Sequence, residues 1–177
     1  MLSIGLATAS AGTVQRFTTC YCAQRGAVPN EAISEDLLSD QNYTMKKKSA
    51  NARFAINSWD EKPYSEGQGL PKLTRATVAK TYTGDIEGQA QVEYLMMYRS
   101  DGSASFVGIE RLVGRIGGKS GTFVLQRTGA FEGGLAKESY TVIAGSATGE
   151  LEGLAGEGTS AVGHGMEHPF SLTYELP

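Results

Sequence analysis

From Ala50 onward, apolar and polar residues alternate with a period of two, and short glycine-containing segments interrupt the alternation. A period of two is typical of β-strands that bury one of their two faces. The interrupting segments read TGDIEG, SDGS, IGGK, EGGL and GSATGE, and segments of this kind join neighbouring strands by tight turns. No stretch between them has the 3.6-residue period of an amphipathic helix. The pattern therefore predicts an all-β domain.

The turns divide this part of the chain into about eight strands that follow one another as a meander. The candidate strands are residues 51–59, 72–83, 89–99, 104–115, 121–131, 135–143, 149–154 and 168–176. A closed barrel leaves no unpaired sheet edge, whereas a sandwich of open sheets does. We therefore predict a closed antiparallel eight-stranded up-and-down β-barrel, as a single domain over residues 45–177.

Residues 1–44 differ from this body. They show no sustained period, and the stretch AQRGAVPNEAISEDLLSDQNY is loop-like. The opening MLSIGLATASAG lacks the positive n-region of a secretory signal. We interpret residues 1–44 as an irregular or disordered N-terminal extension. Two alternatives are an over-extended reading frame, with Met45 as the start of the compact domain, and a poor signal segment.

Composition argues against several classes of partner. The formal net charge is −3, and the basic residues are scattered apart from Lys46, Lys47 and Lys48, so we expect no basic face for nucleic acid. No apolar run approaches the roughly 18 residues of a membrane span, so we expect no membrane contact. Cys20 and Cys22 have no partners for a zinc or redox site. We therefore expect no metal or cofactor, and a reducing, cytoplasmic location.

Three turns allow the strands to be threaded against one another. We take Asp101–Gly102, Gly117–Gly118 and Gly133–Gly134 each as the two central residues of a hairpin turn. Side chains alternate strictly along a strand, so one set of residues then shares one face. That set is Glu93, Leu95, Met97, Phe106, Glu110, Leu112, Phe123, Leu125, Arg127, Phe131, Tyr140 and Val142. The set is rich in large apolar groups, which predicts that it faces the barrel interior.

This predicted interior carries three charged side chains, Glu93, Glu110 and Arg127. Buried charges are costly unless they are paired, so the three form either a structural ion pair or the polar spot of an apolar ligand pocket. If the two carboxylates face each other, one pKa rises, which suits acid and base chemistry. The candidate ligand-binding residues around them are Leu95, Met97, Phe106, Gly108, Phe123, Leu125 and Tyr140. The missing side chain at Gly108 leaves room for the guanidinium or for a ligand.

The opposite face carries an apolar patch on the third and fourth strands. The same threading assigns to it Tyr94, Met96, Tyr98, Val107 and Ile109. Isolated chains rarely expose such patches. We expect either a homo-oligomer that forms through these strands or a cover provided by residues 1–44.

Both histidines lie in the segment AVGHGMEHPF, where His164, Glu167 and His168 match the H-x-x-E-H motif of the inverted zinc metalloproteases. That motif works because a helix presents both histidines on one face. Two glycines and Pro169 disfavour a helix here. We therefore predict a rim loop before the last strand and no metal site. His164 or Glu167 either reaches into the barrel mouth or stays in solvent.

Three stretches of the body share a pattern with a known family. They read SWDEKPYSEGQGLPKLTRATVAKTYTGDIEGQAQVEYLMMYRSDGSASFVGIERLVGRIGGKSGTFVLQRTGAF, GSATGELEGLAGEG and AVGHGMEHPFSLTYEL. Together they resemble bacterial domain-of-unknown-function family 3224, over about residues 50–176. The resemblance implies a closed eight-stranded antiparallel barrel similar to the allene oxide cyclase and dirigent group, and it supplies no catalytic residue. One departure is His168, where the family pattern tends to have an aromatic residue.

Three functions follow, in order of preference. The first is a pocket protein that binds a small, largely apolar metabolite inside the barrel. The second is an isomerase, cyclase or lyase for such a metabolite, with Glu93 or Glu110 as acid or base and Arg127 stabilising oxyanion charge. The third is an oligomeric barrel with a filled interior and a structural or interaction role. Whether the protein is an enzyme stays open at this point.

Overall fold

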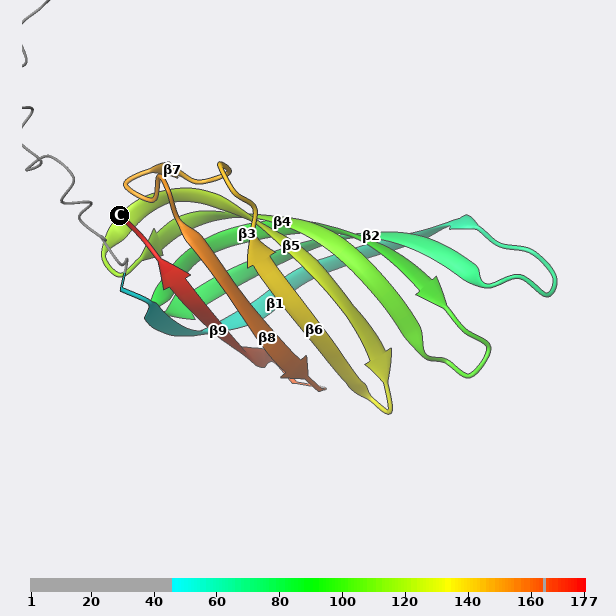
Figure 1. Ribbon diagram of the computed structural model, residues 1–177. Coiled ribbons are helices and arrows are strands. Elements are labelled where there is room, and N and C mark those ends of the chain that lie inside the picture. Colours follow the sequence, from blue (N-terminus) through cyan, green and yellow to red (C-terminus); the bar gives the residue numbers. More distant parts are fainter. Residues whose placement is uncertain (1–45, 164) are drawn as a thin grey trace, which may run out of the picture. The chain divides into compact units, whose positions relative to one another are not determined.

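The structure, a computed structural model, describes residues 46–163 and 165–177 (Figure 1). The predicted extension over residues 1–44, with both cysteines, and His164 lie outside these ranges. The described chain forms nine strands. They are β1 (Lys48–Ser65), β2 (Lys72–Gly84), β3 (Ile86–Tyr98), β4 (Ala104–Ile116), β5 (Lys119–Glu132), β6 (Leu135–Val142), β7 (Thr148–Gly149), β8 (Ala155–Val162) and β9 (Glu167–Glu175).

Eight of these strands form a closed antiparallel barrel. The sheet runs in the order β4-β3-β2-β1-β9-β8-β6-β5, and pairing of β4 with β5 closes it. The ninth strand, β7, adds two residue pairs to β5 and takes no part in closure. Every wall strand lies beside its neighbour in the chain, because turns join them in succession. The predicted closed eight-stranded up-and-down barrel is confirmed.

One predicted strand, residues 149–154, is wrong. Gly149 ends β7, and the residues after it form a turn, in which Leu154 N donates to the carbonyl of Leu151. Both leucine side chains are buried in the core, so their spacing reflects a turn that caps the barrel and not a wall strand. The wall strand that follows this turn is β8.

Two of the three predicted hairpin turns are confirmed. Gly117–Gly118 and Gly133–Gly134 each join strands whose last paired residues flank them directly, and all four glycines have positive φ. Two-residue hairpin turns of the I′ type require this geometry. The predicted pairings of β4 with β5 and of β5 with β6 therefore hold residue by residue.

The turn at Asp101–Gly102 differs from the prediction by one residue. Arg99 N donates to the carbonyl of Ser103 at 2.8 Å, so residues 100–102 form a three-residue loop. The Asp101 carboxylate accepts from Ser103 N at 2.9 Å, and Gly102 takes the left-handed φ of 82° that ends such a loop. The extra residue moves the pairing of β3 with β4, so Glu110 lies opposite Val92 and not opposite Glu93.

This shift reverses the direction of every side chain on β3. The predicted interior positions of Glu93, Leu95 and Met97 are wrong. The Glu93 side chain is 38% exposed and Leu95 is 50% exposed, both on the outer wall. Their places in the interior are taken by the residues of opposite parity on β3. These are Val92, Tyr94 and Met96.

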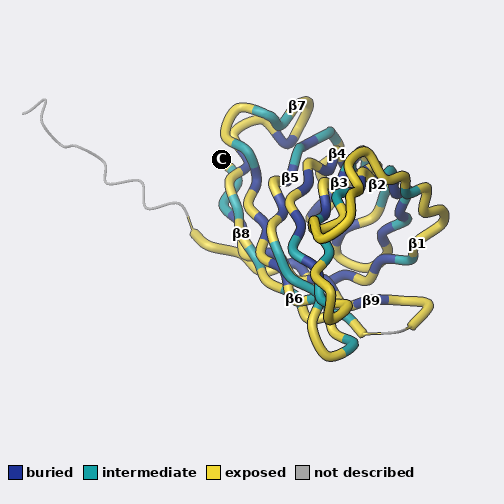
Figure 2. The backbone as a smooth tube through the Cα atoms, turned by 90° about the vertical axis from the view of Figure 1, so that its right-hand side faces the viewer, coloured by how far each residue is buried: buried dark blue, intermediate teal, exposed yellow. Residues whose placement is uncertain are grey.

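The barrel interior has two halves that differ in packing, and Figure 2 shows buried residues alternating with exposed ones along the strands. The packed half is filled by one large cluster of apolar side chains. This cluster comprises Ala50, Ala52, Phe54, Tyr82, Ile86, Ala90, Leu112, Ile116, Phe123, Leu125, Tyr140, Val142, Leu151, Leu154, Phe170, Leu172 and Tyr174. The open half holds a smaller cluster, of which Tyr94, Met96 and Phe106 line a cavity. Its members are Ala76, Val78, Val92, Tyr94, Met96 and Phe106.

The open half is open because β1 loses one of its two neighbours. Pairing of β1 with β9 ends at Ala55, whereas β1 continues to Ser65 with β2 alone. The β1–β2 hairpin therefore projects past the rest of the wall, as Figure 1 shows.

Among the described residues, no helix is long and apolar enough to cross a membrane.

Candidate functional site

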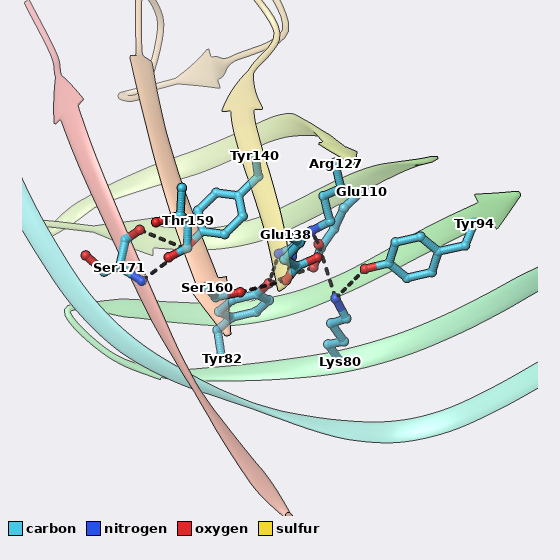
Figure 3. A network of polar contacts seen from close by, with 10 residues as sticks. All are labelled: Lys80, Tyr82, Tyr94, Glu110, Arg127, Glu138, Tyr140, Thr159, Ser160 and Ser171. Carbon is cyan, nitrogen blue, oxygen red and sulfur yellow. Dashed lines mark hydrogen bonds and ion pairs between the residues drawn. The ribbon is translucent and has the colours of Figure 1, made fainter. Parts of the chain in front are cut away.

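A layer of buried charged residues separates the two halves of the barrel. We call Lys80, Glu110, Arg127 and Glu138 the ionic layer; they lie on β2, β4, β5 and β6. All four are at least 91% buried. Figure 3 shows their polar groups converging in the barrel interior. Two cations and two anions balance in charge, which is a requirement for keeping so many ionised groups away from water.

Arg127 is the centre of the layer. It forms ion pairs with Glu110 through Nε and with Glu138 through Nη1, the second at 2.6 Å. Its Nη2 donates to the Tyr82 hydroxyl at 2.7 Å. The guanidinium also lies 4.9 Å from the centre of the Tyr140 ring, in a cation–π contact. Arg127 is thus held by two anions, a phenol and an aromatic face.

Glu110 has three polar partners, of which Arg127 is bound as an ion pair. Besides Arg127, the Tyr82 hydroxyl donates to Oε1 at 2.8 Å, and Lys80 Nζ lies 3.5 Å from Oε2. Burial alone would raise the pKa of Glu110, but the cations of Arg127 and Lys80 and the Tyr82 hydroxyl lower it below its ordinary value. Glu110 is therefore ionised at neutral pH. The expectation of a raised carboxyl pKa at a glutamate pair is wrong, because Glu93 is not there.

Lys80 is the cation of the layer whose charged form is disfavoured by its surroundings. Its Nζ donates to the Tyr94 hydroxyl at 3.2 Å and lies 4.6 Å from the centre of the Phe54 ring. Burial, and then the nearby Arg127 cation, lowers the pKa of Lys80 to about 8, although Glu110 and Glu138 oppose this change. Burial raises the pKa of Tyr94, so its hydroxyl keeps its proton at neutral pH.

A cavity of about 310 Å³ lies on the open side of the ionic layer. Its wall is mainly apolar and aromatic, and its charged lining residues among the described part of the chain are Lys80 and Glu138. The other lining residues are Phe54, Ile56, Trp59, Tyr94, Met96, Tyr98, Gly102, Ala104, Phe106, Phe131, Ala136 and Val162. Trp59, on the projecting part of β1, stacks on Tyr94 at the edge of this cavity. An apolar wall with a few convergent polar groups is the usual composition of a small-molecule site.

The sequence-predicted residues fall into three places. Glu110 and Arg127 face the interior, as predicted, but they bond to each other below the cavity and do not line it. Phe106 lines the cavity. The candidate ligand-binding residues on β5 and β6, which are Phe123, Leu125 and Tyr140, face the interior as predicted, but these side chains belong to the packed half. Leu95 and Met97 are on the outer wall with Glu93, and the cavity does not include them.

Gly108 does leave room, but for an aromatic ring of this chain. Its partner across the strands is Tyr94, whose ring lies where a side chain at Gly108 would stand. The same arrangement recurs at Gly129 with Phe106, the residues paired opposite each other on β4 and β5. These glycines allow the aromatic rings of the cavity wall to lie flat against the neighbouring strand.

The sequence analysis did not identify several polar residues of the site, among them Lys80, Tyr94 and Glu138. Lys80 follows Ala76 and Val78 at every second position of β2, so the alternation of that strand already assigned it to the interior. Glu138 has the parity of Tyr140, which the threading had correctly placed inside. Tyr94 was placed outside by the one-residue error at the 100–102 loop. The sequence pattern that could have identified Lys80 and Glu138 is the alternation of side-chain direction along each strand, applied to polar as well as apolar residues.

The outer wall of β3 and β4 carries an exposed aliphatic patch. Leu95, Val107, Ile109 and Val113 are each at least 50% exposed, and the first two lie opposite each other. The predicted exposure of Val107 and Ile109 is therefore correct. The other three residues predicted for this patch, Tyr94, Met96 and Tyr98, line the cavity instead. A homo-oligomer through these strands stays a prediction.

The segment that contains the zincin-like motif lies at a strand end. Glu167 and His168 are the first residues of β9, so they point to opposite faces of the wall. Glu167 pairs with Arg53 outside, and His168 packs inside against the Phe54 ring at 5.1 Å. Among the described residues, no three histidine, cysteine, aspartate or glutamate side chains gather as metal ligands would.

Comparisons with known proteins identify the family of this barrel. The family model DUF3224, described as a protein of unknown function, matches residues 50–174. A crystal structure of a protein with unknown function from the DUF3224 family, from Shewanella oneidensis MR-1, is similar to this chain. It has 30% sequence identity and a TM-score of 0.58, over 75% of this chain and 98% of that chain. No curated protein matches the sequence. The likeness to allene oxide cyclase and dirigent barrels stays a prediction.

Proposed function

This chain belongs to the DUF3224 family, whose function is unknown, and we propose that its barrel binds a small, largely apolar metabolite in the cavity of the open half. The observation that carries the proposal is the cavity itself, which has about 310 Å³ of space between aromatic and aliphatic side chains. Small-molecule sites begin at about this volume. An apolar ligand would replace water along this wall, and each buried methylene group contributes about 0.8 kcal/mol.

The floor of the cavity favours a ligand with one polar end. Lys80 and Glu138 reach it from below, and both are held by the ionic layer. A carbonyl or hydroxyl group could therefore exchange hydrogen bonds with the floor while the rest of the ligand fills the apolar part. A fully ionic ligand is less suited, because the ionic layer already balances its own charges.

The test is a titration with N-phenyl-1-naphthylamine, a neutral apolar probe that fluoresces when it leaves water. The proposal predicts saturable binding of one probe per barrel. Ala136 lines the cavity on β6, whereas Ala161 is exposed on β8 beside it. Ala136→Phe should fill the cavity and abolish binding, and Ala161→Phe is the matched control that should leave binding unchanged. Equal binding in both variants would place the probe elsewhere and overturn the proposal.

A second candidate, an isomerase, cyclase or lyase acting on the same ligand, is supported by one observation. A lysine and a carboxylate, Lys80 and Glu138, both line an apolar cavity, and such pairs move protons in many enzymes. In this version the acid and base are these two residues, and Glu110 with Arg127 holds them in position. The test is exchange of protons beside the carbonyl of a bound ketone in D₂O, followed by NMR. Glu138→Gln should abolish the exchange while probe binding remains.

A further inference from the structure

The buried lysine at the cavity floor balances the charge of the ionic layer, but a site that only encloses an apolar ligand does not require its amine to line the cavity. An aliphatic residue of similar length would fill the same space without the cost of burying an ammonium group. Lys80 is 3% exposed. Its amine contacts the Glu110 carboxylate, the Tyr94 hydroxyl and the face of the Phe54 ring. Its surroundings therefore indicate a ligand that needs an amine.

From this geometry we infer that Lys80 is a nucleophile that forms a reversible imine with an apolar aldehyde or ketone bound in the cavity. The inference rests on the proposed function, because the carbonyl compound must first occupy the same site. The amine nitrogen attacks the carbonyl carbon and forms a carbinolamine. Loss of water then gives the C=N bond, so the carbonyl oxygen leaves as water and no oxidant or reductant is required.

The groups around Lys80 match the needs of this reaction. The Tyr94 hydroxyl lies 3.2 Å from Nζ, where it can pass a proton from the nitrogen to the oxygen as the carbinolamine forms. A second proton, from solvent, then lets the oxygen leave as water and leaves the nitrogen as an iminium cation. Glu110 lies 3.5 Å from Nζ, where its negative charge stabilises the iminium cation. The cation of the imine replaces the ammonium, so the charge balance of the ionic layer is the same before and after the reaction.

The amine is also available at neutral pH. With a pKa of about 8, roughly one-tenth of Lys80 is uncharged at pH 7, against about one in three thousand for an ordinary lysine. Desolvation by an apolar pocket is a known way to activate a lysine for imine formation. The remaining lysines provide a contrast, because all of them are exposed. They are Lys46, Lys47, Lys48, Lys62, Lys72, Lys119 and Lys137.

The experiment treats the full chain with octanal at pH 7, reduces iminium ions with cyanoborohydride, and maps the modified lysines by mass spectrometry. The expected result is that Lys80 is modified at least about tenfold more than any exposed lysine, in line with its larger neutral fraction. An excess of 1-octanol, which has the same chain but no carbonyl, should prevent the modification by occupying the cavity. Lys80→Arg keeps the positive charge but has no amine that can form an imine, so it should form no adduct in the cavity.

The outcomes separate this inference from the proposed function. If octanal displaces the fluorescent probe but Lys80 stays unmodified, the inference is wrong and the binding function stands. Adducts at exposed lysines alone have the same meaning. If neither the probe nor octanal binds, the proposed function fails, and the inference fails with it. The 1-octanol arm uses the unmodified protein, so the test remains decisive even if Lys80→Arg does not fold.

Discussion

The two halves of this barrel are built from the same strands but differ in what fills them. On the packed side of the ionic layer, aromatic and aliphatic residues interlock, with Tyr140 stacked on Phe170 at 4.5 Å between ring centres. On the open side, the lining of the cavity includes several aromatic rings that face empty space. In the packed half, large side chains fill the barrel interior. Because the same strands continue into the open half, large side chains could have filled the cavity there as well.

This difference indicates that the ionic layer forms the floor of the cavity as well as stabilising the barrel. A buried ion network is often no more stable than an apolar core of the same volume, so stability alone does not account for it. Placed between a packed half and a hollow half, it presents Lys80 and Glu138 to the cavity and keeps Glu110 and Arg127 beneath them. We therefore predict that substitutions in the ionic layer or in the packed half change the stability of the fold, whereas substitutions in the open half change ligand binding.

The largest effect is expected from Glu110→Gln. The variant removes the anion that lies between the cations of Arg127 and Lys80 while keeping the size of the side chain. Removing one partner of a buried ion pair typically costs about 3–5 kcal/mol, and urea denaturation would measure the loss. A cost below about 1 kcal/mol would show that the layer is hydrated and not buried.

A matched pair on β5 tests the two halves directly. Phe123 and Phe131 both point inward from the same strand, but Phe123 is fully buried in the packed half and Phe131 lines the cavity. Phe123→Ala should lower the free energy of unfolding by about 3–5 kcal/mol. Phe131→Ala should lower it by about 1 kcal/mol or less, while weakening the binding of N-phenyl-1-naphthylamine.

An equal loss of stability in the two phenylalanine variants would contradict the difference in packing between the two halves. That result would mean that the open half is as tightly packed as the other and that the cavity closes in solution. Thermal unfolding of the two variants, followed by far-UV circular dichroism, gives the same ranking independently of the denaturant.

The pH dependence of stability tests the Lys80 environment. Because its pKa falls from 10.5 in the free side chain to about 8 in the folded protein, the unfolded chain binds more protons between these two values. Stability therefore rises with pH across this window, by up to about 1.4 kcal/mol per pH unit. Lys80→Met should lack this rise, and the difference between the two proteins removes the contribution of the tyrosines. Parallel curves from pH 8 to 10 would contradict a buried ammonium.

The sequence predicted the barrel and most of the interior because strict alternation and Gly-Gly turns leave few alternatives. Two Gly-Gly turns have one common hairpin geometry, and the threading they fixed is correct from β4 to β6. Asp101–Gly102 suits a two-residue turn and also the end of a three-residue loop. In the structure the Asp101 carboxylate accepts a hydrogen bond from the backbone amide of Ser103, and the loop has three residues. Because of that ambiguity, the side chains of β3 were predicted to point to the wrong faces of the sheet.

The cavity could not have been predicted in the same way. Its existence depends on β1 continuing past the end of β9, which is a matter of strand length on opposite sides of the barrel. The inward direction of Lys80 was available from the parity of β2, but its pairing was not. The distance from Lys80 to Glu110 depends on the tilt and stagger of the closed wall, which alternation alone does not specify.

The smallest effect is expected from Glu93→Gln, the counterpart of Glu110→Gln on the outer wall. Glu93 lies one strand away from Glu110, but its carboxylate accepts from Arg75 at 3.0 Å and from Thr77 in contact with solvent. Exposed ion pairs contribute between about 0 and 1 kcal/mol. The variant should therefore unfold within about 1 kcal/mol of the parent protein and bind N-phenyl-1-naphthylamine unchanged. A loss of stability comparable with that of Glu110→Gln would indicate that Glu93 lies in the interior, and therefore that the side chains of β3 point the opposite way. Tyr94 would then not contact Lys80, and the cavity described here would not exist.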